Sequence, residues 1–330
     1  MIKARELERI FQPRRRRGDD TEMVHAVKGV TFDVAEGEIV SCLGPNGAGK
    51  TTTLRMLTTL LRPTSGEALV AGFDIATDSR QVRRNIGYVS QAGATNAAAT
   101  AIDEVIDHAM LYGLSKKEAH RSAGVLFGQL DLEGLEARQC KSMSGGQRRR
   151  LDLAIGMVHG PRLMILDEPT VGLDPQSRAN LWDHIRRLRA ERQVTVLLTT
   201  HYLDEADALS DRVIVIDDGR IIADDTPQAL KARHGEETLD MEVMDMAMVA
   251  NTVAVISTIT GSGDHISVEG YRVRASVGHG RTNVQQLMRQ FEQAGVELRS
   301  VSIHPPTLDN VFLQLTGRSL REDRAGGVPA

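Results

Sequence analysis

The sequence predicts an α/β domain with a largely parallel sheet, followed by a small α+β domain. Over residues 1–235, short apolar segments typical of buried strands alternate with segments of helical periodicity. Such alternation favours a parallel sheet with both faces covered. One of these strands leads directly into a glycine-rich loop that opens a helix. Near residue 235 the pattern changes, and a second set of strand and helix signals begins.

Composition limits the classes of function. The 330 residues are long for one compact domain. A formal net charge of -4 does not argue for nucleic acid, which favours a strongly basic domain, so we expect no nucleic-acid partner. Two cysteines, Cys42 and Cys140, cannot form a disulfide framework and fit a reducing compartment. No apolar run approaches the ~20 residues that span a bilayer. We therefore expect a cytosolic protein, or one held at the cytoplasmic face of the membrane through a partner.

The elements of the first domain follow in order. Residues 30–34 alternate between apolar and polar side chains, which is typical of a half-buried strand, and 39–43 is the short apolar run of a buried parallel strand. Leucines at helical spacing predict a helix over 52–61. Residues of about 95–160 form a predicted helical subdomain. Strands and intervening helices then return, over 163–166, 175–189, 194–198, 203–209 and 213–216.

The second domain is predicted over 236–317, as a small α+β unit with strands broken by glycines and at least one amphipathic helix. The residues from 318 to 330 are charged and carry glycine and proline, so we expect this tail to be disordered.

The glycine-rich loop has the pattern of a phosphate-binding site. It matches G-x-x-x-x-G-K-[ST], in which glycines let backbone amides converge on phosphate oxygens at a helix N-terminus. Lys50 supplies a cation for the β- and γ-phosphates, and the Thr51 hydroxyl suits a Mg²⁺ ligand. The predicted loop comprises Gly44, Pro45, Asn46, Gly47, Ala48, Gly49, Lys50 and Thr51, followed by Thr52.

Two carboxylates follow the apolar strand at 163–166. Asp167, at the end of a buried strand, can hold the Mg²⁺ shell, and Glu168 can polarise an attacking water. The alternative is a strand that ends in ordinary surface acids. The phosphate loop elsewhere in the chain disfavours that alternative.

Residues 144–147 precede a helix predicted to start near Arg148. Ser144, Gly145, Gly146 and Gln147 form a helix cap with a glycine pair, and also an N-terminus that can bind an anion. With Met143 in front, this segment resembles the signature motif of ABC ATPases, with Met in place of the usual Leu.

Three further motifs of that family occur in the expected order. Gln91 resembles the Q-loop glutamine, Asp174 in Gly-Leu-Asp resembles the D-loop, and His201 after a strand resembles the switch histidine. The resemblance covers about residues 1–235. It implies the P-loop NTPase fold of an ABC ATPase, with a parallel-rich core sheet, N-terminal antiparallel strands and a helical subdomain.

The resemblance also implies a mechanism. Two ATPase chains, a homodimer or a pseudo-dimer, would hold each ATP between the phosphate loop of one chain and the signature of the other. Glu168 would be the general base and His201 would contact the γ-phosphate. Thr51, Gln91 and, through water, Asp167 would hold Mg²⁺.

Segments 144–154, 198–207 and 308–313 resemble the daunorubicin-resistance type of ATP-binding subunit. In that group Gln often stands where His201 stands here. The resemblance implies a separate transmembrane permease of the type-2 exporter family, a role in assembly for 236–317, and a drug, lipid or glycan as the transported substrate.

Phe11 is the nearest upstream aromatic residue that could stack on the adenine, because an insertion containing four arginines separates it from Ala26 and Val27. The alternative is a core residue of the first strand. For the whole chain, an importer subunit and a soluble ABC ATPase remain open. The stretch between Thr51 and Ser144 is too short for the coiled coil of DNA-repair members, and the signature argues against a kinase.

Overall fold

The computed structural model describes residues 1–12, 23–93, 95–260, 266–278 and 284–317. The predicted disordered tail, 318–330, lies outside the described residues. The chain divides into two compact units, Met1–Thr226 and Pro227–Ala330. The described helices include none that is both long enough and apolar enough to cross a bilayer.

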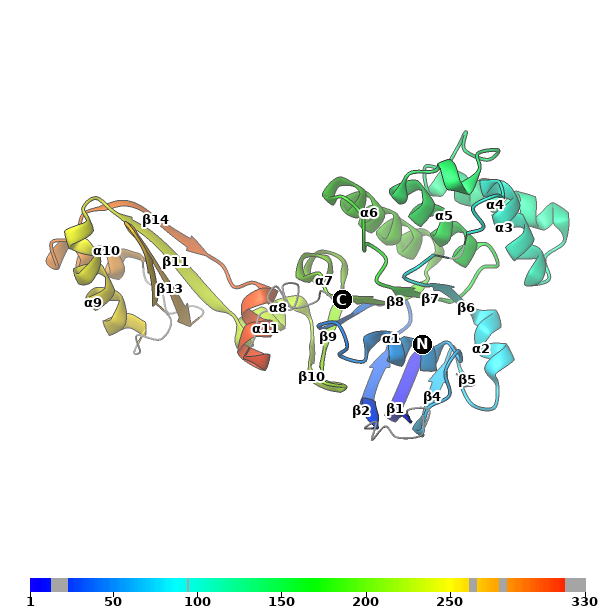
Figure 1. The fold of residues 1–330 in the computed structure, drawn as a ribbon, viewed down its shortest axis with the longest axis horizontal. Helices are drawn as coiled ribbons and strands as arrows, with labels where there is room; N and C mark the ends of the chain where they lie inside the picture. Colours follow the sequence, from blue (N-terminus) through cyan, green and yellow to red (C-terminus); the bar gives the residue numbers. More distant parts are fainter. Residues whose placement is uncertain (13–22, 94, 261–265, 279–283, 318–330) are drawn as a thin grey trace, which may run out of the picture. The chain divides into compact units, whose positions relative to one another are not determined.

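A six-stranded sheet forms the centre of the first unit (Figure 1). Five of its strands, in the order β9-β3-β8-β7-β6, run parallel, as the sequence predicts, and β10 adds an antiparallel edge beside β9. Because the strands are parallel, β3, β7 and β8 all end at one edge of the sheet. The strands are β3 (Ile39–Leu43), β6 (Ile86–Val89), β7 (Leu163–Asp167), β8 (Thr195–Thr200), β9 (Arg212–Asp217) and β10 (Arg220–Asp225).

The first unit also contains an antiparallel sheet in the order β2-β1-β4-β5. Its strands are β1 (Ile2–Phe11), β2 (Val24–Val34), β4 (Ser65–Val70) and β5 (Phe73–Asp74). Figure 1 shows α1 (Lys50–Leu57) between the two sheets, where Leu54 and Leu57 are buried. The short helix α2 (Ser79–Asn85) precedes β6.

Helix α1 is shorter than the predicted 52–61. It begins at Lys50 and ends at Leu57, because the chain turns at Thr59, which has a φ of 61°, and Leu60 is 60% exposed. The leucine spacing therefore continues past the end of the helix.

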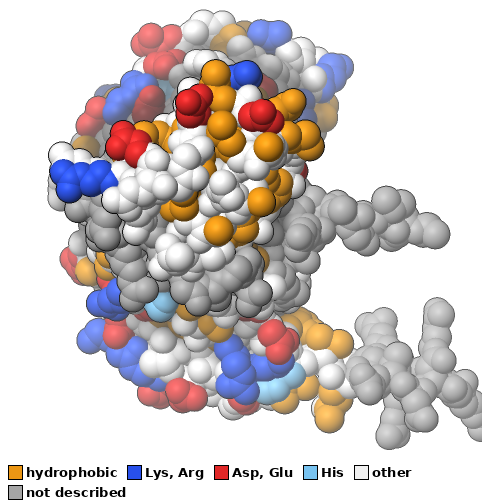
Figure 2. All heavy atoms as spheres, turned by 90° about the vertical axis from the view of Figure 1, so that its left-hand side faces the viewer, with side chains coloured by type: hydrophobic (Ala, Val, Ile, Leu, Met, Phe, Trp, Pro, Cys, Tyr) orange, Lys and Arg blue, Asp and Glu red, His pale blue; other side chains and the backbone are white. Residues whose placement is uncertain are grey.

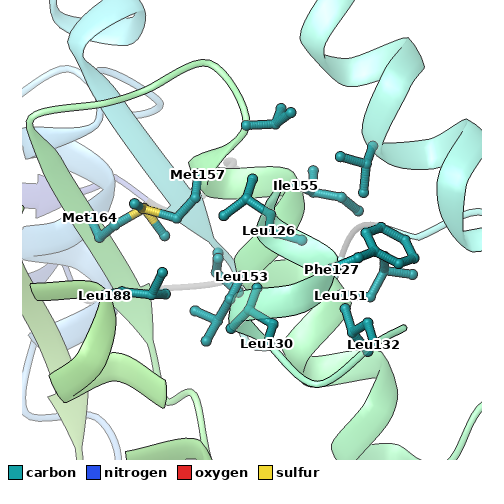
Figure 3. Close-up of a cluster of buried hydrophobic side chains, with 14 of the residues drawn as sticks. Leu126, Phe127, Leu130, Leu132, Leu151, Leu153, Ile155, Met157, Met164 and Leu188 are labelled. Carbon is teal, nitrogen blue, oxygen red and sulfur yellow. The ribbon is translucent and has the colours of Figure 1, made fainter. Parts of the chain in front are cut away.

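The helical subdomain contains α3 (Ala101–Leu111), α4 (Lys116–Gln129) and α5 (Gly145–Met157), with a 3-10 turn at Cys140–Ser142. Figure 3 shows Phe127 of α4 beside Leu151 of α5, and Met157 of α5 beside Met164 of β7. The helices α6 (Pro175–Arg192) and α7 (Leu203–Leu209) follow. One buried cluster thus joins α4 and α5 to the sheet that carries the phosphate loop.

The second unit has an antiparallel sheet in the order β12-β13-β11-β14, the arrangement of a split β-α-β-β-α-β motif. Alternate residues of β11, namely Leu239, Met241 and Val243, are buried in its core. Its elements are α8 (Pro227–His234), β11 (Glu236–Val243), the 3-10 turn η2 (Met246–Met248), α9 (Val249–Thr260), β12 (Ile266–Glu269), β13 (Arg272–Gly278), α10 (Val284–Gln293), β14 (Leu298–His304) and α11 (Leu308–Thr316).

The second unit begins before α8, whereas the sequence places the boundary at residue 235, after that helix. Helix α8 packs against α11, a contact between residues distant in sequence that local periodicity does not reveal. Figure 2 shows exposed hydrophobic side chains together with acidic ones on one face of the molecule. In the second unit, Met244 and Met246 are 51% and 60% exposed.

Phe127→Ala should lower the free energy of unfolding by about 3–5 kcal/mol, because it leaves a cavity where α4 meets α5. Urea denaturation measures the change. Leu111→Ala, at a side chain that is 84% exposed, should change it little. Equal effects of the two substitutions would contradict this packing.

Candidate nucleotide-binding site

The glycine-rich loop lies between β3 and α1, where local geometry requires glycine. Gly49 has a φ of 100°, and a side chain there would run into the carbonyl oxygen of Ala26 on β2. The loop borders a pocket with a volume of about 350 Å³. The pocket is lined by Asn46, Gly47, Gly49, Lys50, Thr51, Thr52, Gln91 and Glu168.

Two other predicted loop residues, Gly44 and Pro45, hold the lysine that lines the pocket. Lys50 Nζ donates hydrogen bonds to the carbonyl oxygens of Gly44, at 2.7 Å, and Pro45, at 2.9 Å. Ala48 is buried. Burial lowers the pKa of Lys50, and the nearby Glu168 carboxylate opposes that shift. The ammonium group is thus fixed at the pocket wall by backbone oxygens.

Asp167 ends β7 and is hydrogen-bonded to residues of α1 and β8. Its Oδ1 accepts hydrogen bonds from Thr51 Oγ1, at 2.8 Å, and Thr199 Oγ1, at 2.7 Å. The side chain is buried, which excludes the alternative of an ordinary surface acid. Thr51 begins α1 after the loop and Thr199 lies near the end of β8, so one carboxylate connects three parts of the site.

Glu168 has an uncommon backbone conformation. Its φ is 47°, in the left-handed region that few non-glycine residues adopt. Its N–H is held by Thr199, through the carbonyl oxygen at 3.2 Å and through Oγ1 at 3.0 Å. Strain of this kind persists when surrounding contacts fix it, and it occurs often at functional sites.

Three side chains surround the Glu168 carboxylate. Lys50 Nζ lies 3.6 Å from Oε1, while His201 Nδ1, at 3.2 Å, and Gln91 Nε2, at 3.3 Å, lie beside Oε2. Burial raises the pKa of the Glu168 carboxyl, but His201 and Lys50 together lower it by more, so its pKa lies below the ordinary value. The carboxylate is therefore ionised at neutral pH. The structure brings together Lys50, Glu168, His201 and Gln91, which are far apart in sequence.

The oxygen-bearing side chains beside the pocket suit Mg²⁺, which takes only a few ligands from a protein. A hydroxyl of Thr51, a carboxylate of Asp167 and an amide oxygen of Gln91 are hard ligands, and Mg²⁺ completes its shell with water and phosphate oxygens. Among the described residues, no group of three or more His, Cys, Asp and Glu side chains could hold a metal ion. The oxygen atoms of Thr51, Asp167 and Gln91 are of the kind that Mg²⁺ prefers.

The segment 144–147 begins α5, three positions before the predicted start at Arg148. Ser144 Oγ accepts a hydrogen bond from the Gln147 N–H, and Gln147 Oε1 accepts one from the Ser144 N–H. This capping box fixes the first turn of the helix. Ser144 and Gly145 are exposed, and no residue from 144 to 147 lines the described pocket of the same chain.

The comparisons with known proteins agree with this geometry. Residues 27–171 match the model of the family described as ABC transporter. The chain is 40% identical to the daunorubicin resistance ATP-binding protein DrrA2 of Streptomyces coeruleorubidus, over 91% of this chain and 93% of the relative. It is 38% identical to the doxorubicin resistance ATP-binding protein DrrA of Mycobacterium tuberculosis, over 88% of each. The chain belongs to the ABC transporter family.

The fold agrees with that of solved members. The ATP-binding cassette MJ0796, in a dimeric post-hydrolysis state bound to ADP and Pi, superposes with a TM-score of 0.61 at 26% identity. The match covers 68% of this ABC family chain and 98% of the cassette. The predicted P-loop ABC ATPase fold is therefore confirmed.

In this ABC family chain, Asp174 forms the N-cap of α6. Its side chain accepts hydrogen bonds from the N–H of Ser177, at 2.9 Å, and from the hydroxyl of that residue, at 2.6 Å. These bonds lower the pKa of Asp174. Ser177 also lies against Gly146, so the predicted D-loop aspartate is fixed close to the signature helix of its own chain.

Phe11 ends β1, opposite Val24 of β2, and is not a core residue, since it is 36% exposed. The guanidinium of Arg9 lies 4.7 Å from the centroid of its ring. Two residues after Val24, Ala26 touches the phosphate loop at Gly49. The exposed ring is therefore on the strand pair that borders the loop, and its assignment to the adenine remains a prediction.

Thr199 and Arg149 contact the site but did not stand out in the sequence. Thr199 lies just beyond the predicted strand 194–198. Its hydroxyl is buried with the apolar strand, and a polar side chain at such a strand end was the one local sign of a role in the site. Arg149 is one of three consecutive arginines, and nothing in its local pattern distinguishes it from its exposed neighbour Arg148.

Gly49→Ala should weaken ATP binding by about tenfold or more, because a left-handed residue strained by ~1–3 kcal/mol would also push against Ala26. Titration with a fluorescent ATP analogue measures the dissociation constant. Gly124→Ala is the matched control, since Gly124 lies within α4 with open space around it. Unchanged affinity in Gly49→Ala would contradict the loop geometry.

Proposed function

We propose that the chain is the ATP-hydrolysing subunit of an ABC exporter, coupled to a separate transmembrane permease. The observation that carries this proposal is the convergence of Lys50, Asp167, Glu168 and His201 at the edge of one phosphate-loop pocket. Phosphoryl transfer needs positioning and charge stabilisation more than covalent chemistry from the protein, and these residues supply both.

The loop binds the phosphates. The first residues of α1 line the pocket, where helix N-terminal amides would bind phosphate oxygens, and Lys50 adds a positive charge that is already oriented by Gly44 and Pro45. A γ-phosphate in the pocket competes with Glu168 for this ammonium group. Nucleotide binding thereby frees the Glu168 carboxylate from one of its three neighbours.

Mg²⁺, when bound with ATP, neutralises charge on the phosphate oxygens. The residues that would hold it are Thr51 and Gln91, with Asp167 acting through water. The Thr51–Asp167 hydrogen bond and the Gln91–Glu168 contact keep these side chains at the pocket wall.

Glu168 acts as the general base. Because its pKa lies below the ordinary value, it is a carboxylate at neutral pH and can accept a proton from a water aligned with the γ-phosphate. His201, beside the same carboxylate, would contact the γ-phosphate and hold Glu168 in orientation.

The site is completed by a second ATPase chain, in a homodimer or a pseudo-dimer. The exposed N-terminus of α5, with Ser144 and Gly146, does not line the pocket of its own chain and has the geometry that binds an anion. It would therefore meet the γ-phosphate held by the other chain. The solved relative MJ0796 is a dimer with ADP and Pi, which supports this arrangement.

The substrate class follows from the relatives. Their names connect them with resistance to daunorubicin and doxorubicin, which favours export of a hydrophobic drug. A lipid or a glycan is the alternative substrate. The chain would act at the cytoplasmic face of the cell membrane, bound to its permease. The second unit, with its own core and exposed Met244 and Met246, would serve assembly of this complex.

Glu168→Gln should lower ATP turnover by about 100-fold or more, because the amide cannot accept a proton, while the affinity for ATP stays within about twofold. Phosphate release and nucleotide titration measure the two quantities. Glu36→Gln, at an exposed ion pair with Arg162, is the control and should leave both unchanged. Wild-type turnover in Glu168→Gln would exclude the proposed base.

Truncation after Thr226 removes the second unit at its structural boundary. We expect the shortened chain to bind ATP but to lose co-purification with the permease. Truncation after Gly317 removes only 318–330 and is the matched control. A chain ending at Thr226 that still assembles and supports transport would refute the assembly role.

A further inference from the structure

The guanidinium of Arg149 is buried in the second turn of α5. The residue is 7% exposed, although it carries a charge and neighbours the exposed Arg148. A buried guanidinium is tolerated only where its donors are matched, because an unmatched charge in the interior costs several kcal/mol. The partners of Arg149 therefore show what fixes it there.

Its hydrogen bonds go to the backbone around the proposed general base. Arg149 Nε donates to the carbonyl oxygen of Pro169, at 2.6 Å, and its Nη2 donates to those of Asp167, at 3.2 Å, and Glu168, at 3.1 Å. Its Nη1 donates to the carbonyl oxygen of Ser90, at 2.8 Å. One side chain thus holds the carbonyls of the three consecutive residues from Asp167 to Pro169, and that of Ser90, the residue before Gln91.

Asp152, one turn later on α5, is the remaining partner of the Arg149 guanidinium. Its Oδ2 lies 3.5 Å from Arg149 Nη1, and both side chains are buried. Gly93, with a φ of 75°, lies so close that a side chain there would come within 3.1 Å of the same oxygen. Four hydrogen bonds and this ion pair account for all five N–H donors of the guanidinium.

The backbone that Arg149 holds is the strained part of the site. Glu168 has a φ of 47°, and its N–H is fixed by Thr199 on one side while its carbonyl is fixed by Arg149 on the other. Leu151, two positions after Arg149 and therefore on roughly the opposite side of α5, packs in the hydrophobic cluster of Figure 3. Arg149 therefore connects a rigidly packed helix to the conformation of Glu168.

We propose that Arg149 is a positioning residue that fixes the Glu168 backbone and the start of the Gln91 loop to the signature helix of the same chain. The proposal rests on the proposed ATP hydrolysis with Glu168 as base. Its consequence is that a displacement of Ser144, at the start of α5, is transmitted through one side chain to the base and to a metal ligand. Ion pairing with Asp152 sets the orientation of that side chain.

Arg149→Lys in the full-length chain tests the proposal. Lysine keeps the charge but cannot reach four carbonyls in the planar fork that arginine presents. We expect kcat for ATP hydrolysis to fall about tenfold or more, the size of effect seen when a residue that orients a metal ligand is changed. KM and the affinity for ATP should stay within about twofold of the wild-type values. Arg186→Lys is the control, because Arg186 makes an exposed ion pair with Asp183 at the same i,i+3 spacing.

A second measurement separates positioning from a general structural role. In a Glu168→Gln background, Arg149→Lys should lower the residual single-turnover rate by less than about twofold, because the residue acts through Glu168. Asp152→Asn, which keeps the carbonyl contacts of Arg149, should give a smaller loss of kcat with unchanged KM. If Arg149→Lys does not yield folded protein, Asp152→Asn tests the proposal by the same measurements, namely kcat, KM and the single-turnover rate in the Glu168→Gln background.

The proposal is overturned if Arg149→Lys leaves kcat unchanged, if it weakens ATP binding as much as turnover, or if the losses multiply in the Glu168→Gln background. Wild type and Glu168→Gln are assayed in parallel. An inactive wild type, or a fully active Glu168→Gln, refutes the proposed function instead, so the two failures are distinct.

Discussion

The hydrogen bonds that Asp167 accepts from Thr51 and Thr199 are the interaction on which the site depends. They exist because β3, β7 and β8 are parallel neighbours and end at one edge of the sheet. The helix after the loop, the carboxylate strand and the strand before His201 are therefore fixed relative to one another by a single buried side chain. Lys50, Thr51 and Glu168, which line the pocket, all follow the ends of β3 or β7.

Glu168 extends this arrangement by one residue. The chain turns immediately after β7 into a left-handed conformation, which aims the carboxylate at Lys50 and His201. The strain is supported from two directions, by Thr199 on β8 and by Arg149 on α5. The proposed base thus joins the core sheet to the helical subdomain, so that chemistry and subdomain orientation depend on the same contacts.

The sequence predicted what is encoded locally. The strand 39–43, the helix 203–209 and the parallel sheet are as expected, because apolar runs and the Gly-x-x-x-x-Gly-Lys-Thr pattern report short-range geometry. It missed the end of α1 at Leu57 and the packing of α8 with α11. It also missed Arg149, whose burial follows from carbonyls 18 to 20 residues away and at Ser90, which no local pattern reveals.

The central claim of this account is that the pocket is half of a site completed by the signature of a second chain. Sedimentation velocity of Glu168→Gln with ATP and Mg²⁺ tests it most directly, with and without the added change Ser144→Arg. The account predicts a dimer with ATP that Ser144→Arg abolishes, although each chain still binds nucleotide. An ATP-dependent dimer that is equally stable with arginine at position 144 would contradict it.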